Sequence, residues 1–107
     1  MQTDVIIAVK KYIENNRRNT HMKIHGTLIK EQGVTFGIIV VKPYVLENSI
    51  ERTRMQQFGT RIFGVVPIIL MAQNSRGIPT YYGRTDIVNF LSKVHPSRIP
   101  WKEYTVA

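Results

Sequence analysis

Residues 26–42 read GTLIKEQGVTFGIIVVK, and this stretch decides the fold. Its first part continues an alternation of apolar and polar residues that begins at Met22, which is typical of a half-buried strand. The Glu-Gln-Gly at residues 31–33 predicts a short turn. Residues 34–41 are apolar on both faces and end at Lys42, as in a strand covered on both sides. The stretch therefore predicts a β-hairpin whose second strand lies deeper in the sheet.

Helical patterns flank this hairpin on both sides. Apolar residues recur at helical spacing over residues 4–17, directly after a threonine that is typical of a helix start. Asn48, with Glu51 three residues later, indicates the start of a second helix. This second helix reaches about Phe63, and Gly64 is well placed to end it.

The rest of the chain predicts further strands and one more helix. The expected elements are a central strand over residues 65–72, a turn at 74–77, a strand at 78–82, a helix capped by Thr85 and Asp86, and an edge strand at 101–106. The order is thus α-β-β-α-β-β-α-β, which predicts an α/β fold with a mixed central sheet covered by helices. With 107 residues, the chain is expected to form a single domain, residues 1–107.

Charge is the strongest compositional signal. Fifteen Lys and Arg stand against seven Asp and Glu, which gives a net charge of +8 and an isoelectric point near 10.1. A field of this sign attracts polyanions, so nucleic acid is the expected partner. An acidic protein partner and a basicity without functional meaning are the alternatives.

The sequence predicts a protein of the cytoplasm that does not enter a membrane. It contains no cysteine, which excludes disulfides and thiolate metal sites and fits a reducing compartment. Its longest apolar run, residues 65–72, is far shorter than the roughly 20 residues of a membrane helix. The start of the chain places Asp4 before its first apolar run and lysines after it, unlike a secretion signal.

The hairpin sequence resembles the core of restriction-endonuclease-like nucleases, in particular archaeal-type Holliday junction resolvases. Those enzymes place an aspartate early in one strand, and a glutamate, any residue and a lysine in the next. Lys42 matches the lysine, whereas Thr27 stands at the aspartate position and Val40 at the glutamate position. The helix and strand that follow are similar at Gln56, Gln57, residues 61–64 and residues 67–69. The likeness covers roughly residues 26–72 and implies a nuclease-like core.

The resemblance also implies a lost activity. Hydrolysis of a phosphodiester in this family needs Mg²⁺ held by carboxylates. Thr27 offers one neutral oxygen and Val40 offers none, so most of the attraction for the ion is gone. We therefore expect no catalytic residues, no metal and no cofactor, on a scaffold that still holds nucleic acid.

Other arrangements of metal-binding residues are weaker. His21 and His25 are four residues apart, but on a strand this spacing spans about 13 Å, too far to chelate one ion. His95 has no visible partner. Glu47 and Glu51 are better explained by helix capping and by pairing with nearby arginines.

The candidate binding residues are basic and aromatic. The residues expected to contact phosphate are Lys42, Arg52, Arg54, Arg61, Arg76 and Arg84. Tyr81 and Tyr82 could stack on unpaired bases. Alternatively, these charges form a solvated face and the tyrosines pack on the sheet. No helix-turn-helix or zinc-finger pattern is present, so the contacts would be mainly to phosphate.

Three functions remain open from the sequence. The leading hypothesis is a nucleic-acid-binding protein on a catalytically degenerate resolvase-like scaffold, with a possible homodimer formed through residues 65–70 and the edge strands. A protein-interaction module, such as an inhibitor or small subunit that docks on an acidic partner, is the alternative. A metal-dependent nuclease with an unusual site is the second alternative.

Overall fold

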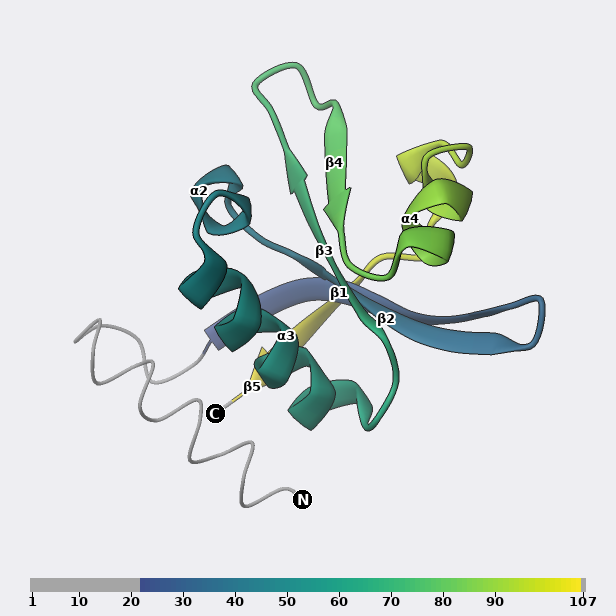
Figure 1. The fold of residues 1–107 in the computed structure, drawn as a ribbon, viewed down its shortest axis with the longest axis horizontal. Coiled ribbons are helices and arrows are strands. Elements are labelled where there is room, and N and C mark those ends of the chain that lie inside the picture. Colours follow the sequence, from purple (N-terminus) through teal and green to yellow (C-terminus); the bar gives the residue numbers. More distant parts are fainter. Residues whose placement is uncertain (1–21, 107) are drawn as a thin grey trace.

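The computed structural model describes residues 22–106, which form an α/β fold around one mixed sheet with helices on both faces (Figure 1). The strands in this part of the chain are β1 (Met22–Glu31), β2 (Val34–Val40), β3 (Ile68–Gln73), β4 (Pro79–Tyr82) and β5 (Lys102–Val106). The helices in the same range are α2 (Pro43–Leu46), α3 (Ser49–Phe63), α4 (Thr85–Leu91) and the 3₁₀ helix η1 (Pro96–Arg98). The helix expected over residues 4–17 lies outside the described residues.

The hairpin predicted from residues 26–42 is confirmed. β1 and β2 pair antiparallel from Gly26 opposite Ile39 to Glu31 opposite Val34. Gln32 and Gly33 connect them with φ angles of 51° and 79°. Two successive positive φ values are the mark of a type I′ turn, whose twist matches that of the paired strands.

β2 is the central strand of the sheet. The strand order is β4-β3-β2-β1-β5, with β2 and β3 parallel and the other neighbours antiparallel. Its burial on both faces explains why residues 34–41 are apolar without alternation. β5 lies at one edge against β1, as predicted for the end of the chain.

The third strand begins later than the sequence indicates. β3 starts at Ile68, whereas Val65 is 97% exposed. The backbone N–H of Val66 bonds to the carbonyl of Gly64, and the Pro67 carbonyl accepts from Gly37. Residues 64–67 therefore turn the chain from α3 into the sheet and are not part of the strand.

α3 packs closely on one face of the sheet. The Asn48 side chain accepts from the backbone N–H groups of Ile50 and Glu51, as the capping pattern predicts. A Cβ at Gly59 would lie 2.6 Å from Cγ2 of Ile68 and 2.8 Å from Cδ1 of Ile39. Glycine disfavours a helix interior, but at this position its lack of a side chain lets α3 approach the sheet. The buried residues of this face are Ile24, Ile39, Val45, Phe58, Ile68 and Leu70.

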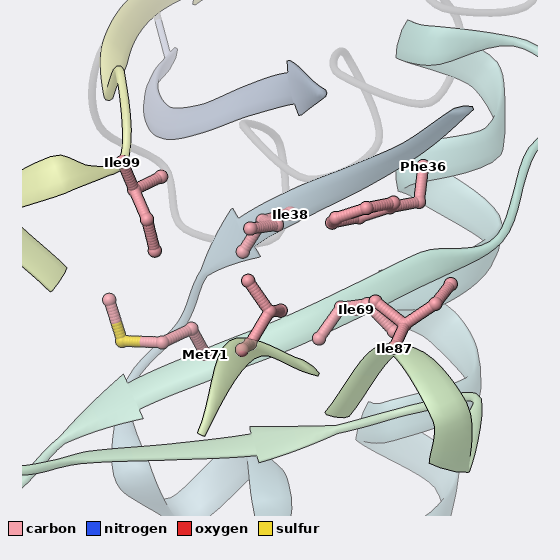
Figure 2. Packing of buried hydrophobic residues seen from close by; sticks show 7 residues of the cluster. Phe36, Ile38, Ile69, Met71, Ile87 and Ile99 are labelled. Carbon is pink, nitrogen blue, oxygen red and sulfur yellow. The ribbon is translucent and has the colours of Figure 1, made fainter. Parts of the chain in front are cut away.

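The opposite face is covered by α4 and the segment that follows it. Its buried residues are Phe36, Ile38, Ile69, Met71, Ile87, Leu91 and Ile99 (Figure 2). α4 differs from the sequence prediction at its start, because Arg84 is the N-cap residue and no side chain caps the helix. Thr85 is already helical, and Asp86 instead pairs with Arg84.

Two short helices interrupt the expected order of elements. α2 follows β2 and η1 precedes β5, so the order in residues 22–106 is not the predicted one. Both begin at a proline, Pro43 and Pro96. Proline suits the first helical position because its fixed φ is already helical and its missing N–H has no partner there.

Candidate functional site

The arginines of α3 interact mainly with the protein itself. Arg52 is half-buried, donates from Nη1 to the Leu46 carbonyl at 2.7 Å and lies 4.6 Å above the Tyr82 ring. Arg54 pairs with Glu51 at 3.3 Å, and Arg61 is exposed near the end of the helix. Arg52 and Arg54 therefore direct part of their charge to the helix and its neighbours.

Tyr81 and Tyr82 lie on opposite faces of the sheet, as successive residues of a strand must. Tyr82 lies under Arg52 on the α3 side, whereas Tyr81 packs against the core on the α4 side. The Tyr81 hydroxyl is buried without a hydrogen-bond partner, and burial raises the pKa of Tyr81. The two rings therefore do not form one stacking surface.

Arg84 forms a two-pronged ion pair with Asp86. Its Nε and Nη2 donate to the two carboxylate oxygens, each at 2.8 Å. These bonds lower the pKa of Asp86 and raise the pKa of Arg84. The charge of Arg84 is thus balanced by its own neighbour.

The positions that carry the nuclease resemblance lie in β1 and at the end of β2. Thr27 is buried opposite Ile38, and Val40 lies two residues further along β2 on the same face. Lys42 is exposed and is the N-cap residue of α2. Within residues 22–106 no three His, Asp or Glu side chains gather in an arrangement that could hold a metal ion.

The described residues form a groove of about 830 Å³, which we call the α4-side groove. Its floor includes Val40 and Met71, near the carboxyl ends of the parallel strands β2 and β3. One wall is the turn between β3 and β4, with Arg76 and Ile78, and the other includes Trp101. In Figure 1 this turn stands at the top, and α4 lies to its right.

Hydrogen bonds fix the side chains around this groove. The Trp101 indole donates to the Pro96 carbonyl at 2.9 Å. Nδ1 of His95 accepts from the backbone N–H of Ser97, which favours the tautomer with the proton on Nε2. The Gln73 amide nitrogen donates to the Gly77 carbonyl at 3.0 Å.

The α4-side groove has no acidic lining residue among those that the structure describes. Arg76 is exposed there, and its guanidinium has no carboxylate partner among residues 22–106. His25 also lines the groove and lies 3.4 Å from Glu103, whose other oxygen is 3.9 Å from Lys23. The groove is therefore positive at the rim and apolar at the floor.

Of the residues expected to bind nucleic acid, Arg76 alone lines this groove. Val40, His25 and His95, which the sequence raised only in connection with a metal site, line it as well. Gln73 and Trp101 were missed as binding residues, because they come from separate segments and form no spacing motif. The one available signal was the end of an apolar strand at Gln73, since strand ends of parallel sheets often line ligand sites.

Comparison with known proteins adds no assignment. No protein-family model matches the chain, and no curated protein or solved structure is detectably similar to it. No helix within residues 22–106 is long and apolar enough to cross a membrane.

Proposed function

We propose that this protein binds nucleic acid at the α4-side groove, with contacts mainly to phosphate. The observation that carries the proposal is the exposed Arg76 at the rim of a groove without acidic lining residues. An arginine without a carboxylate partner keeps its forked donors available for phosphate oxygens. The net charge of +8 supports the same kind of ligand, because it attracts polyanions over a long range.

The distribution of ion pairs supports this groove over the polar side of α3. Arg54 is paired with Glu51, and Arg52 is bonded to a carbonyl. By contrast, Arg98 is an exposed residue of η1, next to the groove residues Pro96 and Ser97, and it has no ion-pair partner in the part of the chain that the structure describes. Exposed cations without partners contribute most to counterion release when a nucleic acid binds.

The proposed scaffold is resolvase-like and does not cut. Val40, at the position of the glutamate, lines the α4-side groove, and Thr27, at the position of the aspartate, is buried on the same face. The groove thus occupies the place where the resemblance puts the catalytic centre. Because these positions are neutral, the groove can attract phosphate without holding Mg²⁺.

Fluorescence anisotropy with single-stranded, duplex and branched DNA at several salt concentrations tests the proposal. We expect steeply salt-dependent binding. Arg76→Gln should weaken it and lower the slope of log affinity against log salt by about 1. Arg54→Gln removes the same charge from α3 and serves as the matched control, with little change expected.

Each other outcome has a defined meaning. Absence of binding at low salt overturns the proposal. A larger loss for Arg54→Gln than for Arg76→Gln moves the interface to α3. Capture of one stoichiometric protein, insensitive to nuclease treatment, by a protein without nucleic-acid affinity supports the protein-interaction alternative. Mg²⁺-dependent cleavage that Lys42→Ala abolishes supports the active nuclease instead.

A further inference from the structure

We infer that the α4-side groove takes an unpaired nucleobase, so that the protein prefers single strands to duplexes. This inference rests on the proposed function and narrows its ligand. Phosphate contacts alone would need only cations at the surface, as Arg76 provides at the rim. The apolar floor behind that rim indicates that the same ligand also has an apolar part, which binds there.

The size and lining of the groove suit a base. Its volume of about 830 Å³ is that of a small-molecule site. Val40, Met71 and Trp101 give it an apolar surface, and Ile78 adds a side chain that is 55% exposed. A nucleobase has apolar faces and a polar edge, and so can occupy such a groove while its phosphate stays at Arg76.

Trp101 is the stacking residue in this arrangement. Its indole N–H is held by the Pro96 carbonyl at 2.9 Å, so the orientation of the ring is set before a ligand arrives. Aromatic rings stack on bases of any sequence, and each such contact strengthens binding about tenfold to hundredfold. This role replaces the one that the sequence suggested for Tyr81 and Tyr82, which lie on opposite faces.

Two polar groups remain to meet the edge of the base. The amide nitrogen of Gln73 is engaged with Gly77, which leaves its Oε1 as an acceptor. Nδ1 of His95 is engaged with Ser97, which leaves Nε2–H as a donor. Base edges present both donors and acceptors, and in a duplex the Watson–Crick edges are paired and the ring faces are stacked.

Intrinsic fluorescence provides a direct test, because Trp101 is the only tryptophan of the chain. The probes are a thymine oligonucleotide, a strand of equal length whose nucleotides are abasic, and a duplex of equal charge. We expect the oligonucleotide to quench Trp101 and to bind about tenfold to hundredfold more tightly than the abasic strand. The duplex should bind without quenching, and an RNA strand of the same length shows whether the sugar matters.

A matched pair of variants ties the signal to the groove. Ile78→Asp places a negative charge in the groove, whereas Ile50→Asp places the same charge on α3, where the parent isoleucine is 67% exposed. Since both side chains are exposed, both variants should fold. Ile78→Asp should abolish the quenching and the preference for the oligonucleotide, and Ile50→Asp should preserve both.

The outcomes separate this inference from the proposed function. Failure of all probes to bind at low salt overturns the proposed function and the inference together. Equal affinity for the oligonucleotide, the abasic strand and the duplex, without quenching, overturns the inference alone. Quenching that survives in Ile78→Asp also overturns it, because the base would then lie elsewhere.

Discussion

The two faces of the sheet have similar apolar cores, but the helices that pack on them differ greatly in length. On one face α3 has 15 residues, and Gly37 and Gly59 leave room for it to lie close to β2 and β3. On the other face α4 has only 7 residues, and the α4-side groove remains open near the carboxyl ends of β2 and β3. Within residues 22–106, α3 therefore covers its face of the sheet more completely than α4 covers the other.

This difference teaches where a ligand can bind on a small sheet. A face that is fully packed offers only the outer side of its helix, where Arg54 already pairs with Glu51. The partly covered face offers side chains from several segments around one hollow, among them Arg76 and Trp101. Binding residues of α/β proteins usually lie in loops at the ends of the strands, held by the rigid sheet.

Among the tests of this difference between the two faces, the largest change in stability is expected at Gly59. Gly59→Val should lower the free energy of unfolding by about 3 kcal/mol, because the added side chain meets Ile68 and Ile39. Valine is a slightly better helix former than glycine, so a loss of stability would be caused by the packing and not by helix propensity. Chemical denaturation measures it.

Thr53→Val is the control for this substitution. Thr53 is exposed on the same helix, so its replacement should change the stability by less than about 0.5 kcal/mol. A Gly59→Val protein as stable as the parent would contradict the close packing of α3 on the sheet.

The helix starts give a smaller, paired prediction. Asn48→Ala should cost about 1 kcal/mol of unfolding free energy, because it removes the bonds to the N–H groups of Ile50 and Glu51. Thr85→Ala at α4 should cost less than about 0.5 kcal/mol, because no side chain caps that helix. Thermal or urea unfolding of both variants measures the difference. Equal losses of stability would support the cap that the sequence predicted at Thr85.

The smallest effect concerns the exposed pair of Arg84 and Asp86. Bonds from Arg84 lower the pKa of Asp86, so the pair stabilises the fold above the ordinary carboxyl range. This contribution is lost as the pH falls through the lowered pKa. An NMR titration should show a pKa of Asp86 below the usual carboxyl range. Arg84→Gln should raise this pKa toward the usual range. An unshifted Asp86 in the parent protein would argue against the pair.

The elements that the sequence predicted well are those set by local chemistry. The turn at Gln32 and Gly33 needs positive φ values, and the continuous apolar residues 34–41 suit only a strand covered on both faces. Asn48 caps α3 in the predicted way. In each case the signal and the structure lie within a few residues of each other.

Of the elements that the sequence misplaced, one depends on a residue far away in the chain and the other on a near neighbour. Val65 continues an apolar run, but β3 begins at Ile68, where pairing with Gly37 starts. Thr85 and Asp86 have the composition of a cap, but Asp86 instead bonds to Arg84. Composition indicates which residues can form an element, and pairing with a neighbour decides where it begins.

By itself the sequence determined the basic charge, the α/β class and the central hairpin, because these follow from composition and short-range pattern. Arg54 and Arg84 pair with acids two or three residues away in the chain. Only the tertiary structure decided which cation borders the groove, because it brings Arg76 together with Gln73 and Trp101. The physical reason is that the groove forms between segments that are distant in sequence. No spacing of residues along the chain indicates that α4 is too short to cover this part of the sheet.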